Sequence, residues 1–416
     1  MWFLLTLIHL VAIFHRVSFN VMADRLTAEF GLTGAALGNL AAAYTYMYLI
    51  MQIPGGTLVD RFGPRQIALF SGLSMAAGAI IFGLAPGTGS IFLGRMIIGF
   101  GGSVVLINIF KFQAAWFRSS EFATMSGFAL LISGGGALLA ATPLVMLIKT
   151  IGWRSSFVVI GLITAVITMV CWYVVRSDPH VDDQSADFTH RTGESSVDAL
   201  RSMFRAASAV LSNRRIRMLL LINLGIYGGF IVFSGTWGVS YLVHVYGINT
   251  EQASVLMILA FLGYMIGAPL VGSISDRIGS RKSPAIVLVL CSALFWLVII
   301  TWPGSPIPLG FLYGLSVFLG LGAASTVMTF TMAREASPSE LTGSVTATVN
   351  VGTFLGLAIL QPLVGYLLDL RWEGLILEGV RIYPYSAYRF AFSACLLFAV
   401  ISLVAVLLYR ENEQKG

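Results

Sequence analysis

Apolar stretches of roughly 20 residues, the length that crosses a bilayer as a helix, fill this chain, and one polar signature between them occurs twice. The first copy, residues 56–65, reads Gly-Thr-Leu-Val-Asp-Arg-Phe-Gly-Pro-Arg, and the second copy occupies residues 272–281. Each position of the second copy follows its counterpart by 216 residues, and the same spacing pairs Gly31 with Gly247. A repeat of that length in an apolar chain indicates two homologous bundles of membrane helices.

The composition places most of the chain in lipid. Of its 416 residues, 57% are hydrophobic and 11% are charged, whereas a soluble domain carries about 25% charged residues. The net charge of +6 does not indicate nucleic acid, because the basic residues lie in short loops between apolar spans rather than in one patch. The three cysteines, Cys171, Cys291 and Cys395, fall inside apolar spans and are interpreted as small buried hydrophobic residues.

Motifs of enzymes and of ATP-driven pumps are missing from the sequence. It contains no Gly-x-x-x-x-Gly-Lys loop for nucleotide phosphates, no metal-ligand spacing and no convincing catalytic triad. We therefore expect no enzymatic activity, no metal and no cofactor.

Twelve membrane-spanning helices are predicted, in an all-α integral membrane protein built from two pseudo-symmetric six-helix bundles. The spans are expected near residues 2–22, 37–58, 66–85, 91–115, 122–147, 154–175, 215–242, 251–271, 284–302, 308–331, 343–368 and 388–409. The longest polar stretch falls halfway along the chain and is interpreted as a linker. We predict an N-terminal bundle at 1–176, a cytoplasmic linker at 177–213, a C-terminal bundle at 214–410 and a cytoplasmic tail at 411–416.

Lys and Arg set the expected orientation of these spans. If the linker is cytoplasmic, most of the 25 Lys and Arg residues lie on the cytoplasmic side, as the positive-inside rule requires. We therefore expect a multi-pass protein of a bacterial inner membrane with both termini in the cytoplasm, and an organelle membrane stays open as an alternative. Nothing in the sequence demands more than a monomer.

The repeated signature is interpreted as a gate at the cytoplasmic end of the second helix in each bundle. Its first glycine allows close helix packing, and its aspartate can pair with a helix N-terminus or with basic side chains of the opposite bundle. Such a contact closes the cytoplasmic face and breaks when that face opens. A single copy reads equally well as an ordinary turn, but two copies in register argue against that alternative. The gating candidates are Gly56, Asp60, Arg61 and Arg65 in the first copy and Gly272, Asp276, Arg277 and Arg281 in the second.

With this signature and its twelve spans, the chain resembles the major facilitator superfamily over its whole length. Further matches are Arg95-Met-Ile-Ile-Gly-Phe-Gly-Gly102 on the fourth span and Trp116-Phe117 followed by Glu121. The resemblance implies the major facilitator fold and alternating access. In that mechanism two six-helix halves rock around a central cavity lined mainly by the first, fourth, seventh and tenth helices.

The first span is similar to the organic-anion branches of that superfamily, the anion:cation symporters and, more distantly, the organophosphate antiporters. The residues that carry this similarity include His15-Arg16 and Asn20. In those branches an Arg on the first helix binds the anionic group, and by resemblance this is Arg16. Many of those symporters have an acidic residue just before that Arg and a Glu in the fourth helix, where this chain has His15 and Gly102. Both acids are linked to proton coupling, so the coupling ion stays open between H+ and a counter-anion.

Arg16 is also the leading substrate-binding candidate on physical grounds. All 19 Asp and Glu residues lie in loops or at helix ends, so no carboxylate is expected beside it. At about 1.5 Å per residue, Arg16 lies roughly 20 Å along the helix from Trp2. A charge at that depth is costly unless it faces water or a partner, which makes it a functional candidate. Outward snorkelling or bonding to carbonyls is the alternative. His9 shares the helical face of Arg16 and His15 points about 100° away; both are coupling candidates, because histidine titrates near neutral pH, and His15 is otherwise a packed histidine.

Further polar and aromatic side chains are predicted to line a cavity that hydrogen-bonds a polar solute. These candidates are Asn20 on the first span, Tyr48 on the second, Asn108 and Lys111 on the fourth, and Tyr227, Trp237 and Tyr241 on the seventh. For Lys111, snorkelling to the cytoplasmic interface is an equal alternative, and for the aromatic residues the alternative is helix packing.

Together these features predict a secondary active transporter for a small organic anion, such as a carboxylate, a sugar acid or a phosphorylated metabolite, by symport or antiport. Multidrug or neutral-solute efflux is the main alternative, although the spans lack an acid that would attract cationic drugs. A receptor or sensor that does not transport is less favoured, because no signalling domain is appended and the linker is short.

Overall fold

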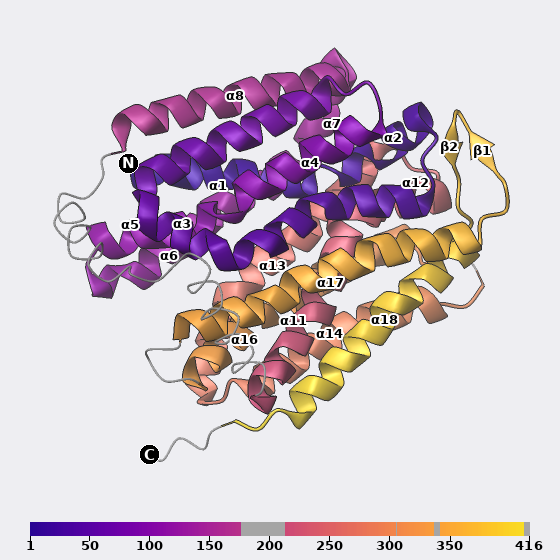
Figure 1. Cartoon of the computed structure of the whole chain (residues 1–416). Coiled ribbons are helices and arrows are strands. Elements are labelled where there is room, and N and C mark those ends of the chain that lie inside the picture. Colours follow the sequence, from indigo (N-terminus) through magenta and orange to yellow (C-terminus); the bar gives the residue numbers. More distant parts are fainter. Residues whose placement is uncertain (176–212, 305, 337–341, 412–416) are drawn as a thin grey trace. The chain divides into compact units, whose positions relative to one another are not determined.

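The computed structural model describes residues 1–175, 213–304, 306–336 and 342–411, which are predominantly helical (Figure 1). The elements before the central gap are α1 Trp2–Val17, η1 Asn20–Met22, α2 Ala23–Phe30, α3 Gly34–Gly83, α4 Thr88–Ser103, α5 Val105–Trp116, α6 Ser119–Leu139, α7 Thr142–Ile151 and α8 Trp153–Val174. After the gap come α11 Arg214–Val232, the π-helical turn η2 Phe233–Trp237, α12 Gly238–Tyr246, α13 Thr250–Ile278, α14 Lys282–Thr301, α15 Leu309–Ala323, α16 Ser325–Glu335, α17 Thr342–Leu370 and α18 Tyr385–Leu408. Two short strands, β1 Ile376–Leu377 and β2 Val380–Arg381, pair antiparallel between α17 and α18.

The predicted spans correspond to apolar helices in the described residues. Nine helices there are long and apolar enough to cross a membrane, and two bent helix pairs raise the number to 11. The remaining predicted span, 37–58, lies in the first part of α3. The predicted all-α membrane fold class is therefore confirmed, while the predicted linker at 177–213 lies, except for Asn213, outside the described residues.

The helix α3 covers two predicted spans and is broken between them at Gly63. This residue has φ 74° and ψ 167°, far from helical values, and positive φ is accessible to glycine without a steric cost. Pro64 follows at once and lacks the backbone N–H that would continue the helical hydrogen bonds. The first copy of the signature therefore forms the turn between two spans.

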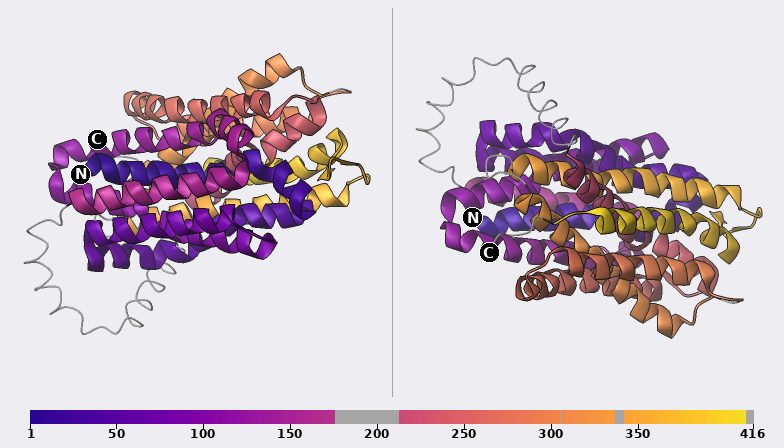
Figure 2. Two further views of the ribbon diagram at one scale, coloured as in Figure 1. Left: turned by 90° about the horizontal axis from the view of Figure 1, so that it is seen from above. Right: turned by 90° about the horizontal axis from the view of Figure 1, so that it is seen from below.

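The described chain forms two compact units. Unit 1 comprises residues 1–16, 46–139 and 147–208, and unit 2 comprises residues 17–45, 140–146 and 209–416, both including residues outside the description. Unit 2 thus contains η1, α2 and the start of α3 together with the helices of the second half. Within it α17 and α18 run side by side (Figures 1 and 2). The predicted domain boundaries, which follow the repeat, stay a prediction.

Glycines in repeat-related positions allow the same close helix contact in both units. A Cβ added at Gly136 of α6 would lie 2.1 Å from the carbonyl oxygen of Leu10 on α1. In unit 2 a Cβ at Gly352 of α17 would lie 2.4 Å from the carbonyl oxygen of Leu220 on α11. Backbones approach this closely only where side chains are absent, which is how small residues drive helix packing in lipid.

Candidate substrate site and gates

Arg16 lies where the first span is broken. The helix α1 ends at Val17, and the span continues as η1 and α2. Arg16 is half-buried in the last turn of α1, where the unpaired carbonyls of a helix C-terminus favour a cation. Discontinuous helices are a common setting for binding sites in transporters, because their free ends can face a bound ion or substrate.

The two histidines of α1 lie in different surroundings. His9 is buried, and its Nδ1 lies 2.8 Å from Ser133 Oγ on α6. Because the Ser133 hydroxyl donates to the Ala129 carbonyl at 2.6 Å, the imidazole is the donor in this contact. His15 is fully buried between the rings of Phe14 and Phe157. Both histidines stay predictions as coupling groups, and the surroundings of His15 are those of a packed residue.

Asn108 and Lys111 of α5 donate hydrogen bonds to α3 on either side of its break at Gly63. The Lys111 ammonium donates to the Val59 carbonyl at 3.0 Å, and the Asn108 amide donates to the Pro64 carbonyl at 3.0 Å. Val59 and Pro64 lie on either side of the break at Gly63. In this structure the two side chains therefore stabilise the turn of the first signature copy.

The aromatic candidates also differ from one another. Tyr48 on α3 is 6% exposed in unit 1. Tyr227 on α11 is 7% exposed in unit 2, and its ring contacts Phe230 and Tyr264, with centroids 5.8 Å and 6.1 Å away. Both stay candidates for lining a cavity in their own unit.

Trp237 and Tyr241 belong to the packed interior of unit 2. The indole of Trp237 donates to the Gln361 carbonyl on α17 at 3.2 Å and is 1% exposed. Tyr241 is fully buried, and its ring packs against Tyr388 and Phe392 of α18 with centroids 5.2 Å and 5.5 Å away. In this structure Trp237 and Tyr241 therefore serve as helix-packing residues, which was the alternative to lining a substrate cavity.

The π-helical turn η2 changes the face of the seventh span on which Tyr241 lies. A uniform helical spacing would place Tyr227 and Tyr241 on roughly one face. A π turn inserts an extra residue and rotates the next part of the helix by about 100°. Residues after Trp237 therefore face α18 and α2 rather than continuing the face of Tyr227.

Asn20 joins the two interrupted spans within unit 2. Its amide nitrogen donates to the Ser234 carbonyl at 2.8 Å, and its amide oxygen accepts from the Val239 backbone N–H at 3.2 Å. Ser234 is in η2, where helical hydrogen bonding is altered, and Val239 is in the first turn of α12. Asn20 thus links η1 to η2 and to the start of α12 through the two ends of its amide.

In the first signature copy, Arg65 contacts α8, a helix of the same half of the chain. Its guanidinium lies over the Trp172 ring at 4.1 Å and donates to the Trp172 carbonyl on α8 at 3.0 Å. Arg61 lies over the adjacent ring of Phe62 and is exposed, and Gly56 has open space where a Cβ would stand. The side chain of Asp60 lies outside the description.

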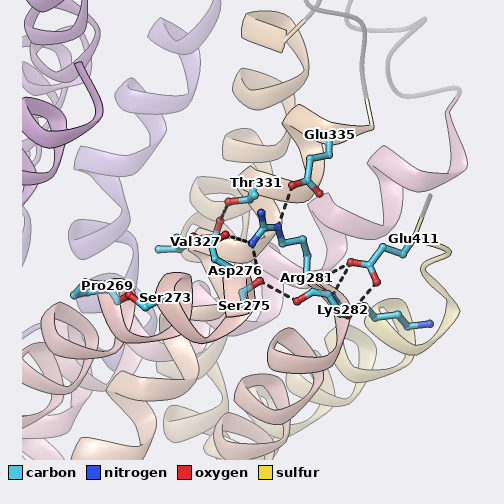
Figure 3. A network of polar contacts seen from close by, with 11 residues as sticks. Pro269, Ser273, Ser275, Asp276, Arg281, Lys282, Val327, Thr331, Glu335 and Glu411 are labelled. Carbon is cyan, nitrogen blue, oxygen red and sulfur yellow. Dashed lines mark hydrogen bonds and ion pairs between the residues drawn. The ribbon is translucent and has the colours of Figure 1, made fainter. Parts of the chain in front are cut away.

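The second copy forms the polar network shown in Figure 3. Arg281 donates to Asp276 and Ser275 of the same signature and to Glu335 at the end of α16, the last at 3.0 Å. Glu411, after α18, accepts from the backbone N–H groups of Arg281 and Lys282 at 2.5 Å and 3.3 Å. The carboxylate thereby caps the first turn of α14.

This network differs from the predicted partners of Asp276. The prediction gave Asp276 a helix N-terminus or basic side chains of the opposite bundle, but in the structure it accepts from Arg281 five residues on. The turn at Gly279, with φ 71°, folds the loop back so that the two side chains meet. Of the other candidates, Gly272 has open space at its Cβ position, and Arg277 is exposed.

Two carboxylates outside the predicted site join residues 17–45 to the second-half helices. Asp369 of α17 accepts from the backbone N–H groups of Gly34 and Ala35, each at 2.8 Å, and so caps α3. Asp24 of α2 accepts from Ser240 of α12 at 2.6 Å. These contacts lie at what we call the hairpin end of unit 2, made by α2, the end of α12 and the β1–β2 hairpin. The sequence repeat gave one indication of these contacts, because Asp24 and Ser240 are 216 residues apart and so occupy equivalent positions in its two copies.

Comparison with known sequences defines the class of this protein. The sequence model of the Major Facilitator Superfamily matches residues 5–250 and, a second time, residues 219–416. The chain therefore belongs to the Major Facilitator Superfamily, as its motifs predicted, and is a multi-pass membrane transporter rather than an enzyme.

Several curated relatives are similar to the chain over most of its length. It is 24% identical over 382 residues to the probable sulfoacetate transporter SauU of Cupriavidus necator, covering 87% of this chain and 85% of the relative. It is 28% identical over 373 residues to a D-galactonate transporter of Escherichia coli, covering 85% of each. A probable galactarate/D-glucarate transporter of Bacillus subtilis is 27% identical over 339 residues, covering 72% of this chain and 73% of the relative.

Solved structures show the same fold at lower identity. A bacterial homologue of the human lysosomal transporter Spinster, in an inward-facing and occupied conformation, superposes with a TM-score of 0.76 at 16% identity, covering 98% of this chain and 96% of that one. A D-xylose–proton symporter superposes with a TM-score of 0.67 at 16% identity and the same coverage.

Proposed function

We propose that this transporter moves a small organic anion, a carboxylate, sulfonate or sugar acid, by alternating access, with Arg16 as the residue that binds the anionic group. The observation that carries the proposal is the place of Arg16 in the last turn of α1, where the first span is interrupted. The sequence places its 19 carboxylates in loops or at helix ends, so a deep cation here is suited to an anionic ligand.

The names of the relatives support the same substrate class. Sulfoacetate, galactonate and glucarate, which those proteins are named for, are small hydroxylated or sulfonated acids with at least one anionic group. A guanidinium binds such groups through paired N–H donors. Tyr48 and Tyr227 are proposed to contribute hydroxyl and ring contacts, and Lys111 to assist only where the substrate competes with the Val59 carbonyl.

The remaining functional expectations belong to the same proposal. The protein would reside in a bacterial inner membrane as a monomer, with both termini, the linker and the signature loops in the cytoplasm and the hairpin end on the opposite side. Transport would be coupled to H+ or to a counter-anion.

Ligand-induced thermal stabilisation of the purified protein tests the role of Arg16. Sulfoacetate, D-galactonate and D-glucarate are compared with a neutral sugar and a cationic drug, for the wild type and for Arg16→Gln. We expect one acid to raise the melting temperature of the wild type and to lose at least tenfold in affinity, about 1.4 kcal/mol, in Arg16→Gln. Arg25→Gln, an exposed arginine on α2, is the matched control and should bind like the wild type.

Two results would contradict the proposal. Equal stabilisation of wild type and Arg16→Gln by the acid would remove Arg16 from the site. A response only to the neutral sugar or to the cationic drug would favour the efflux alternative.

A further inference from the structure

At the hairpin end, a carboxylate from the first half meets an imidazole from the second. Asp24 Oδ1 lies 3.5 Å from His244 Nε2, and the side chains are 26% and 2% exposed respectively. Within the described residues, His244 Nε2 makes no hydrogen bond. Its contact with Asp24 is therefore electrostatic, and its strength depends on whether the imidazole carries a proton.

The other ring nitrogen of His244 is held in place by α18. His244 Nδ1 lies 3.0 Å from the hydroxyl of Tyr388, and the rings of Tyr388 and Tyr383 stand 6.0 Å and 6.2 Å from the imidazole. This hydrogen bond orients the ring so that Nε2 points toward Asp24. A fixed ring with one unpaired nitrogen facing a carboxylate is the arrangement expected of a proton-binding pair.

Further ionisable groups face this pair from the neighbouring elements. Tyr383 donates to Asp369 of α17 at 2.8 Å, and Arg381 of β2 lies 3.7 Å from the same carboxylate. The negative charge of Asp369 is thus balanced by Arg381, and its oxygens accept hydrogen bonds from Tyr383 and from the N-terminus of α3. That leaves Asp24 as the carboxylate of this end that faces an imidazole, at 3.5 Å.

We propose that Asp24 and His244 form the proton-binding site that couples this transporter to H+, and that proton binding favours closure of the hairpin end. This inference rests in part on the proposed function, for which it names the coupling ion. Protonated His244 forms an ion pair with Asp24, whereas neutral His244 leaves the carboxylate without an opposite charge. The proton comes from solvent, which reaches the partly exposed Asp24, and no other bond is made or broken.

The location of the pair ties it to the opening of the hairpin end, whereas His9 lies within unit 1. Asp24 is on α2 and His244 on α12, so the pair exists only while these helices are together. Opening of the hairpin end separates the two groups, and the proton loses its ion-pair partner. His9 and Ser133 lie within unit 1, so their contact would persist when α2 leaves α12. Because linkage is reciprocal, a proton that favours closure is also bound more readily by the closed form.

A conformational titration tests the pair without any substrate. Spin labels at Arg25→Cys on α2 and Thr301→Cys at the end of α14, in a background without native cysteines, report the opening of the hairpin end as an electron–electron distance. We expect the ratio of closed to open molecules to be roughly tenfold higher at pH 5.5 than at pH 8. His244→Gln and Asp24→Asn should abolish this pH dependence. Ser240→Ala, which removes only a hydrogen bond to Asp24, should retain it.

The result that overturns the inference is a wild-type distance that does not change with pH, or a pH dependence that persists in both His244→Gln and Asp24→Asn. Because the titration needs no ligand, it decides the inference even where none of the tested acids is transported. That second failure would instead count against the proposed function.

Flux measurements in liposomes add a test of coupling. With D-galactonate as the probe, the wild type should accumulate the acid under an imposed pH gradient and exchange it at equal pH. We expect His244→Gln to lose at least tenfold in gradient-driven accumulation while its exchange at equal pH stays within about twofold. Gradient-driven accumulation by His244→Gln equal to that of the wild type would contradict the inference.

Discussion

Gly38→Ala tests whether residues 17–45 must lie directly against α17 for the hairpin end to close. A Cβ at Gly38 would stand 2.4 Å from the carbonyl oxygen of Gln361 and 2.7 Å from Cα of Pro362. Both atoms are backbone, so neither can rotate away. The start of α3 would have to move outward by at least 0.6 Å to reach 3.0 Å, the lower limit for such contacts.

The energetic cost follows from the neighbouring hydrogen bonds. The same outward movement would lengthen the two bonds from Gly34 and Ala35 to Asp369, each 2.8 Å, beyond the usual limit of about 3.2 Å. Hydrogen bonds to a charged group contribute about 1.5–3 kcal/mol each. Loss of both corresponds to roughly 3 kcal/mol, or about a 100-fold fall in the ratio of closed to open molecules.

The distance between spin labels at positions 25 and 301 measures this ratio. Gly38→Ala should shift the distribution toward the longer distance. The control is Gly314→Ala on α15, where a Cβ would meet nothing within 4 Å and only the helix propensity changes. A Gly38→Ala distribution that matches the wild type would refute the reasoning, because the contact would then tolerate a methyl group.

Two further predictions concern charged groups at the two ends of unit 2. Asp369→Asn removes the charge that caps α3 and should weaken hairpin-end closure by about 1–2 kcal/mol, measured as the distance between the same spin labels. The control is Glu373→Gln, which changes an exposed carboxylate nearby. Equal distance distributions for the two variants would contradict the capping role of Asp369. At the signature end, Asp276 is 70% exposed and Glu335 is 36% exposed. Asp276→Asn should therefore change stability by less than about 0.5 kcal/mol. Arg281→Gln, which loses its bonds to Asp276, Ser275 and Glu335, should cost about 1 kcal/mol. Melting temperatures in detergent check the order, and a reversed order contradicts it.

The spans and the family could be predicted from the sequence because both depend on local composition. Apolar length predicts a membrane helix wherever it occurs, and the repeated signature needs only a comparison of the chain with itself. The break at Gly63 was also within reach, since Gly63-Pro64 is a signal that ends a helix.

Individual contacts were harder to predict, for identifiable reasons. A uniform helix would place Tyr241 on the face of Tyr227, and the sequence gives no sign of the π turn at Phe233–Trp237 that changes this face. Asp24 and Asp369 stand at helix ends, where a carboxylate usually faces water. Only the fold shows that α12 and the start of α3 cover them.

The interruptions at η1 and η2 divide the first and seventh spans into a longer helix, α1 or α11, and a shorter one at the hairpin end, α2 or α12. Asn20 and Thr236, one in each interruption, are 216 residues apart, so the two interruptions occupy the same position in the repeat. Because the backbone at each interruption already departs from α-helical geometry, the shorter helix can rotate by changes in a few backbone dihedral angles there, without breaking regular helical hydrogen bonds. The shorter helices α2 and α12 can therefore move while α1, which carries Arg16, keeps its helical structure.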